Sequence, residues 1–210
     1  MWAFEKNYVL PEEIDQGPVP ARWLLPVWLF LTVFLCSFSA FNAYFYCGFG
    51  LTQALLLVPF AFVFARLAAI DLCYLLLLNI YTVPLFISGL AFNIFITGGS
   101  VAGVGLQESL LGAFLAALVG VLLNLFMSLF DRQKGEFGFG DVKMLAVMGV
   151  WVGLEGLAFA LAIAFVSNLV IAFLIPRNQP LPFGFGLVIG TWVLVAFKEP
   201  FLDGLFYAFG

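Results

Sequence analysis

The sequence predicts an all-α, polytopic integral membrane protein: a helical bundle of about seven transmembrane helices. Of its 210 residues, 64% are hydrophobic and only 10% are charged, and the mean hydropathy is +1.14. A soluble domain of this size cannot bury so much apolar surface. The apolar runs are long and do not alternate with polar residues as the strands of an outer-membrane barrel do, which favours helices.

The first four crossings are predicted from apolar runs of about 20 residues, the length that a helix needs to pass through the hydrocarbon layer. The first starts where the charged N-terminal stretch ends. Asp71 separates the second from the third, and a glycine-rich connection separates the third from the fourth. These crossings are predicted over 23–46, 52–70, 72–96 and 106–130.

The last three crossings are predicted over 142–154, 157–175 and 183–197. The first of them has about 13 residues, so we expect a broken or partly immersed helix there. Small residues four positions apart, in Gly149–Gly153 and Gly186–Gly190, would let helix backbones approach closely, and we expect them to serve packing. The 27 Phe residues are expected on lipid-facing surfaces.

The positions of Lys and Arg predict a cytoplasmic N-terminus, because cations near helix ends are retained on the cytoplasmic side. With seven crossings in this orientation, Lys198 is the one cation predicted on the outer side of the membrane. We therefore expect a multi-pass protein of the cell inner (cytoplasmic) membrane, with a cytoplasmic tail over 1–21 and a single transmembrane domain over 22–210. The cations predicted on the inside are Lys6, Arg22, Arg66, Arg132, Lys134, Lys143 and Arg177.

Charge and residue counts exclude several classes of function. A net charge of -4 without a basic cluster argues against nucleic acid as a partner. The chain has no His, so imidazole catalysis and imidazole metal ligation are excluded. Cys36, Cys47 and Cys73 form no C-x-x-C pair and are interpreted as small buried hydrophobes. We expect no metal and no cofactor.

Two acids stand at membrane depth, where an ionised side chain is costly unless it has water, a partner or a proton. Asp71 opens the predicted third crossing and Asp141 the fifth, so the topology places both on the same side. Two adjacent carboxyl groups share a proton, so one activates water while the other protonates the scissile carbonyl or the leaving group. This is aspartic-protease chemistry. Gly138 and Gly140 would allow unusual backbone angles and close approach around Asp141.

The same residues also permit other interpretations. Asp141 alone would serve as the N-cap of a helix, and Asp71 as an interfacial acid paired with Arg66. Lys143 is either an anchor at the bilayer edge or a group that tunes the acid pair. The alternative function is an ion- or proton-coupled membrane transporter that uses the same acids, but its inverted repeats are not evident. If the protein were a purely structural subunit, the presence of both acids at membrane depth would have no explanation.

Three segments resemble one family. Gly135–Gly149 contains the sequence G-F-G-D-V-K and resembles the G-x-G-D-x-K signature of type IV prepilin peptidases, a branch of the GxGD intramembrane aspartyl proteases. Ala69-Ile-Asp71, with Asn79 eight residues later, is similar to the family's first-aspartate motif. Leu181–Gly186 resembles its late Pro-Phe-Gly element. The resemblance covers roughly residues 50–195.

The chain departs from the family pattern at three places. Leu78 stands where Pro usually precedes the Asn, and Phe185 where Pro is common. The long cytoplasmic insertion with two C-x-x-C pairs, carried by the larger bifunctional members, is absent, so zinc binding and N-methylation are not expected. The chain resembles the short members that serve tight-adherence pilus systems, or their archaeal preflagellin relatives.

The resemblance implies that Asp71 and Asp141 are catalytic, with Gly138, Gly140 and Lys143 as the scaffold around the second aspartate. It also implies a prepilin or pseudopilin substrate whose short basic leader is cut on the cytoplasmic side of its hydrophobic helix. The cleaved segment must be extended, because a helical peptide bond is hydrogen-bonded and shielded. The lipid bilayer is the other expected partner, and a homo-oligomer is left open.

Overall fold

The structure, a computed structural model, describes residues 18–45, 51–95, 104–130, 138–175 and 179–209. In these ranges it contains a short 3-10 helix, η3 (Ala21–Trp23), and six α-helices, with no strand. The predicted all-α class is therefore confirmed. The α-helices are α1 (Leu24–Phe45), α2 (Leu51–Tyr74), α3 (Asn79–Phe95), α4 (Leu106–Phe130), α5 (Phe139–Leu174) and α6 (Phe183–Phe209).

The surface of the bundle is strongly apolar. Side chains such as Phe114, Phe165 and Phe173 are 65%, 66% and 83% exposed, which is unfavourable in water and expected for a surface that faces lipid. By length and composition, three described segments could cross a membrane: Leu57–Tyr74, Leu106–Phe126 and Phe139–Leu174. Three shorter apolar segments accompany them: Leu24–Ser37, Asn79–Ile94 and Phe183–Ala196.

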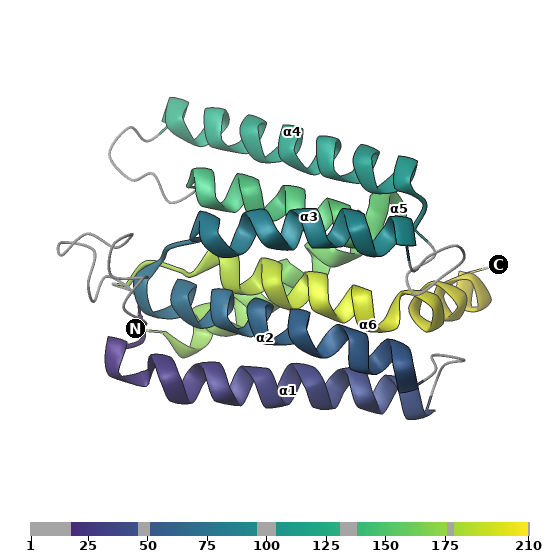
Figure 1. Cartoon of the computed structure of the whole chain (residues 1–210). Helices are drawn as coiled ribbons and strands as arrows, with labels where there is room; N and C mark the ends of the chain where they lie inside the picture. Colours follow the sequence, from purple (N-terminus) through teal and green to yellow (C-terminus); the bar gives the residue numbers. More distant parts are fainter. Residues whose placement is uncertain (1–17, 46–50, 96–103, 131–137, 176–178, 210) are drawn as a thin grey trace.

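The helices lie roughly side by side, with α1 and α4 on opposite sides of the bundle (Figure 1). Helix α5 packs against both α4 and α6, and α1 packs against α2. The end of α2 and the starts of α3, α5 and α6 lie together at one end of the bundle, on the left in Figure 1. Residues that are far apart in the sequence therefore meet at this end.

Helix α5 reverses its direction at Gly153, whose φ of 70° and ψ of -175° lie outside the helical region. A positive φ is readily adopted by glycine because it has no Cβ. The part before Gly153 leads away from the end of the bundle where α5 starts, and the part after it returns, so the two halves form a hairpin (Figure 1). The runs predicted over 142–154 and 157–175 correspond to these halves, with no loop between them.

Glycines let both halves of α5 pack closely against their neighbours. A Cβ built on Gly112 of α4 would lie only 2.7 Å from the carbonyl oxygen of Gly149. On the other side, Gly190 of α6 faces the backbone of Ala160 and Ala164. The packing role predicted for the paired small residues is therefore confirmed at Gly149 and Gly190.

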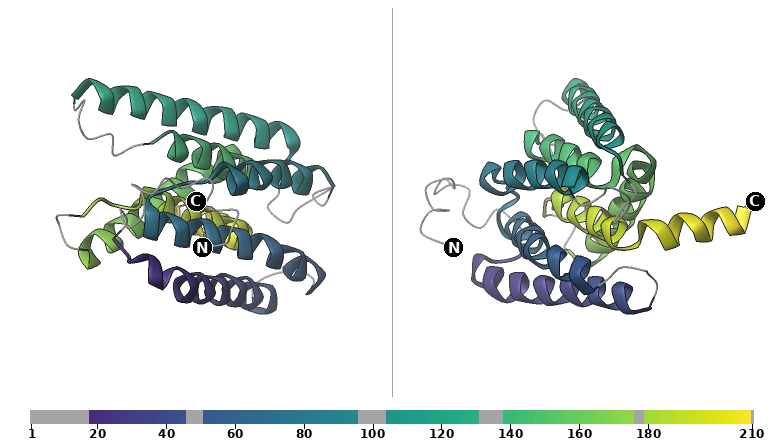
Figure 2. Two further views of the ribbon diagram at one scale, coloured as in Figure 1. Left: turned by 60° about the vertical axis from the view of Figure 1, so that its left-hand side comes forward. Right: turned by 45° about the vertical axis from the view of Figure 1, so that its right-hand side comes forward.

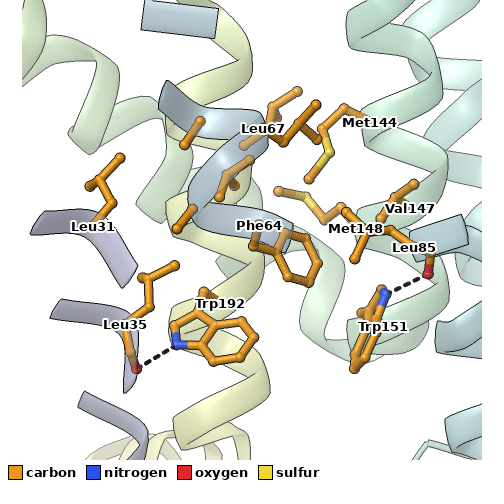
Figure 3. Close-up of a cluster of buried hydrophobic side chains, with 14 of the residues drawn as sticks. Leu31, Leu35, Phe64, Leu67, Leu85, Met144, Val147, Met148, Trp151 and Trp192 are labelled. Atoms are coloured by element: carbon orange, nitrogen blue, oxygen red, sulfur yellow. Dashed lines mark hydrogen bonds between the residues drawn. The ribbon is translucent and has the colours of Figure 1, made fainter. Parts of the chain in front are cut away.

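The core centres on two fully buried tryptophans (Figure 3). The indole N–H of Trp151 donates to the carbonyl of Leu85 at 2.9 Å, and that of Trp192 donates to the carbonyl of Leu35 at 3.1 Å. The ring of Phe64 lies between them, with its centroid 5.7 Å from that of Trp151 and 5.6 Å from that of Trp192. Each large ring thus packs in the core with its one polar atom satisfied, which ties α5 to α3 and α6 to α1.

The boundary between α2 and α3 differs from the prediction. Helix α2 continues past Asp71 to Tyr74, and the link to α3 is the leucine run Leu75–Leu78. The helix ends because Leu75 has a φ of 55°, a left-handed conformation that costs a non-glycine residue roughly 1–2 kcal/mol. A run of leucines contains no glycine or proline that would indicate such a break.

The last helix also differs from the prediction. Helix α6 continues to Phe209 instead of ending at residue 197, and its final part points away from the other helices (Figure 2). At the other end of the chain, the N–H of Val19 donates to the carbonyl of Leu72 at 3.2 Å, so the chain contacts α2 before α1 begins. Four cations on which the predicted orientation depends lie outside the described residues: Lys6, Arg132, Lys134 and Arg177.

Candidate active site

Asp71 lies in the last turn of α2 and is only 4% exposed. Its Oδ2 accepts a hydrogen bond of 2.8 Å from the backbone N–H of Phe185 in the first turn of α6. The first N–H groups of a helix lack partners within that helix, and the helix dipole stabilises a carboxylate at this position. Asp71 therefore caps a helix other than its own. The prediction that it opens a crossing is wrong, because α2 ends after it.

Asp141 lies in the first turn of α5 and is 8% exposed. Its Oδ2 accepts a hydrogen bond of 2.9 Å from the N–H of Gly138, and its own N–H donates to the carbonyl of Gly138 at 3.0 Å. The first of these bonds is the carboxylate half of a capping box, in which the side chain at N3 accepts from the N–H of the N-cap residue. The second is a backbone bond, because glycine has no side chain to supply the other half. The N-cap residue is thus Gly138, and the alternative assignment of Asp141 as the N-cap is wrong by three residues.

The structure brings the end of α2, which carries Asp71, and the start of α5, which carries Asp141, together at one end of the bundle (Figure 1). Leu77 of the α2–α3 link lies against both motifs. A Cβ built on Gly140 would lie 3.0 Å from Cβ of Leu77, and one built on Gly184 would lie 2.8 Å from its Cδ2. Leu77 therefore packs against two turns: the one that precedes Asp141 and the one, at the start of α6, that binds Asp71.

Oδ2 of each aspartate accepts a backbone hydrogen bond, from the N–H of Phe185 at Asp71 and from the N–H of Gly138 at Asp141. Two carboxyl groups arranged in this way can share and exchange a proton.

Arg66 does not neutralise Asp71. The two residues are five positions apart on α2, so their side chains leave the helix in directions about 140° apart. The guanidinium of Arg66 lies over the ring of Trp28, with Cζ 4.9 Å from the ring centroid, which is a cation–π contact. Within the described part of the chain, no ion pair joins Arg66 and Asp71, so the predicted alternative pairing is wrong.

The two scaffold glycines differ from each other. Gly138 has φ -87° and ψ 162°, which any residue adopts, and a Cβ there would lie 3.8 Å or more from its nearest neighbours. Gly140 approaches Leu77 closely. The expectation of an unusual backbone angle is therefore wrong at Gly138, whereas close approach is confirmed at Gly140.

Lys143 joins two of the sequence motifs. Its Nζ donates to Oδ1 of Asn79, the first residue of α3, at 2.8 Å. Both side chains are exposed. No ion pair links Lys143 to Asp71 or Asp141 in the ranges that the structure describes. Lys143 therefore fastens the start of α5 to the start of α3.

The profile of the type IV leader peptidase family matches residues 56–174, which is more than half of the chain and includes both aspartates. The chain belongs to the type IV leader peptidase family. No solved structure matches the chain significantly.

Several curated relatives are named prepilin leader peptidase/N-methyltransferase. The one from Aeromonas hydrophila is 35% identical over 193 residues, which cover 88% of this chain and 61% of the relative. The one from Aeromonas salmonicida (strain A449) is 34% identical over 158 residues, or 72% of this chain and 51% of the relative. The one from Xanthomonas campestris pv. campestris is 33% identical over 186 residues, or 83% and 59%. The chain therefore spans about half to three fifths of the length of these relatives.

In this member of the type IV leader peptidase family, the structure places further residues at the site that the sequence did not predict there. The Pro-Phe-Gly element indicated the segment with Gly184 and Phe185 but not its contact with Asp71. Leu77 has no distinguishing signal, because it is one of four consecutive leucines. Asn168, an amide inside an apolar run, is the kind of residue that membrane depth makes informative.

Proposed function

We propose that the protein is a membrane-embedded aspartic endopeptidase that removes the short basic leader of prepilin or pseudopilin-like substrates. The observation that supports this most strongly is that Leu77 packs both against Gly140, next to Asp141, and against Gly184, next to the carboxyl group of Asp71, in a chain of the type IV leader peptidase family. The proposal includes seven crossings of the cell inner membrane, a cytoplasmic N-terminus and a site at the cytoplasmic membrane edge.

In the proposed mechanism, the aspartate pair holds one proton between its two carboxyl groups. The ionised acid takes a proton from water as the water oxygen bonds to the scissile carbonyl carbon, and the protonated acid donates to the carbonyl oxygen. The C–N bond then breaks as a hydroxyl of the tetrahedral intermediate returns its proton to the second acid. The leaving amine takes the proton that came from water, so the pair again holds one proton. The backbone N–H groups of Phe185 and Gly138 hold the two acids in place during these transfers.

The proposed activity is limited to leader cleavage. The names of the relatives add an N-methyltransferase activity, but the C-x-x-C pairs that accompany it in the larger members are absent from this sequence. The proposed hydrolysis requires no cofactor, since water is the nucleophile and the two acids supply and remove the protons.

Purified protein in liposomes tests this function against the transporter alternative. With a prepilin that carries a basic leader ahead of its hydrophobic helix, we expect cleavage of a single peptide bond, identified by mass spectrometry. An absence of cleavage, together with ion flux in liposomes without pilin, would replace the peptidase with the transporter.

Gly184→Ala is expected to lower leader cleavage at least tenfold, whereas Gly138→Ala is expected to change it less than twofold. A Cβ at residue 184 would lie 3.0 Å from Cγ of Asp71 and 2.8 Å from Cδ2 of Leu77, but a Cβ at residue 138 makes ordinary contacts. A misplacement of a catalytic group by about 1 Å can lower the rate about a hundredfold, so a smaller displacement of Asp71 is expected to lower it about tenfold. Rates of cleavage of one prepilin by both variants provide the comparison, and equal rates would contradict it.

Lys143→Ala and Asn79→Ala are each expected to reduce kcat/KM about three- to tenfold. Their effects should not add, because both remove the same hydrogen bond of 2.8 Å. The measurement is a double-mutant cycle on kcat/KM. If Lys143→Ala cleaves at the full rate, Lys143 is only an anchor at the membrane edge.

A further inference from the structure

Asn168 is the buried polar residue that the proposed mechanism leaves unexplained. It lies in the returning half of α5 and is 8% exposed. Its Oδ1 is the one buried side-chain polar atom without a hydrogen-bond partner in the described part of the chain. A buried acceptor without a partner destabilises a fold. Residues that break such a rule are expected at functional sites.

The other end of the same amide holds the start of α6. Nδ2 of Asn168 donates to the carbonyl oxygen of Phe183 at 3.3 Å. Only this orientation of the amide places a donor against that carbonyl, because the reverse would oppose two acceptors. Asn168 therefore fixes the first residue of α6 from a neighbouring helix.

Gly186 makes the room that the amide occupies. A Cβ built on Gly186 would lie 2.5 Å from both Cγ and Oδ1 of Asn168, so a larger residue there would have to displace the amide. The turn is thus held at Phe183 by a hydrogen bond and at Gly186 by direct contact. Between these two points lies the N–H of Phe185, which donates to Oδ2 of Asp71 at 2.8 Å.

We propose that Asn168 is a positioning residue for Asp71, acting through the turn Phe183–Gly186. It holds this turn so that the N–H of Phe185 meets the carboxyl group of Asp71. This inference rests on the proposed peptidase function. Asn168 itself touches neither the substrate nor Asp71, so its loss should affect the chemical step and not substrate binding.

The first test is Asn168→Leu, which keeps the number and branching of the side-chain heavy atoms and removes both polar atoms. We expect kcat for prepilin cleavage to fall about tenfold with KM unchanged, and the thermal unfolding temperature to stay the same or rise because the unpaired Oδ1 is gone. The matched control is Asn93→Leu. Asn93 is also buried, but its Nδ2 donates to Oγ of Ser109 and to the carbonyl of Val150, away from both aspartates. That control should unfold at a lower temperature and keep kcat.

A second pair of variants remains decisive if Asn168→Leu fails to fold. Gly186→Ala alone should lower the unfolding temperature, because the new methyl group collides with the amide. Adding Asn168→Ala removes the collision, so the double variant should recover its stability while kcat stays about tenfold low.

The named outcomes separate this inference from the function on which it rests. Wild-type kcat in Asn168→Leu or in the stable double variant would overturn the positioning role, as would a loss of kcat that only follows a loss of stability. An inactive wild-type protein in the same assay would overturn the proposed function itself and the inference with it.

Discussion

Asp71→Asn and Asp141→Asn are each expected to abolish leader cleavage, lowering the rate by about a thousandfold or more, while the protein stays folded and inserted. Asparagine has the shape of aspartate and keeps a carbonyl oxygen to accept the N–H of Phe185 or of Gly138. It cannot take a proton from water or pass one to the substrate, so the pair loses its function. The measurement is the rate of prepilin processing by purified variants or by cells that co-express the substrate.

Glu155→Gln is the control for this pair of variants. Glu155 is exposed and lies two residues after Gly153, at the turn of the α5 hairpin and away from both aspartates, so its neutralisation should leave the rate unchanged. Near-normal cleavage by both aspartate variants would remove the aspartate-pair mechanism. If the variants instead stop an ion flux in vesicles that lack any pilin, the transporter is the better explanation.

Gly149→Ala is expected to destabilise the protein by about 3 kcal/mol or more. Glycine to alanine inside a helix ordinarily stabilises by up to about 1 kcal/mol. Here the sign reverses, because a Cβ on Gly149 would collide with the backbone of Gly112 and Ala113 in α4, and backbone cannot move aside as a side chain can. Thermal unfolding of the purified protein in detergent measures the effect.

Gly105→Ala is a control for the added methyl group alone: Gly105 lies just before α4, and a Cβ there would meet nothing within 4 Å. The same chemical change there should shift the unfolding temperature by little. Equal stability of the two variants would show that α4 and α5 are not in backbone contact at Gly149.

The parts of the site that follow from topology were predictable from the sequence. Counting crossings is enough to place Asp71 and Asp141 at the same end of the bundle, and small residues at spacing four indicate where helices approach. The resemblance of Leu181–Gly186 to the Pro-Phe-Gly element also indicated the segment that supplies the N–H of Phe185. Each of these signals is a pattern of residue types along the chain. It can be found without knowledge of the tertiary structure.

Other features depend on side-chain direction and backbone conformation, which no residue pattern in this sequence indicates. The left-handed residue Leu75 lies in a uniform leucine run, so the end of α2 was misplaced. Arg66 is near Asp71 in sequence but turns to Trp28. Lys143 was expected at the membrane edge or at the acids, and its partner Asn79 became evident only when α3 and α5 were placed side by side.

The reversal at Gly153 determines the end of the bundle at which the last motif emerges. Without it, the 36 residues of α5 would form a straight rod of roughly 54 Å. Such a rod would carry the chain to the end of the bundle opposite Asp71, and α6 could start only there. The reversal at one glycine returns the chain along the bundle, so α6 begins beside the acid that it stabilises.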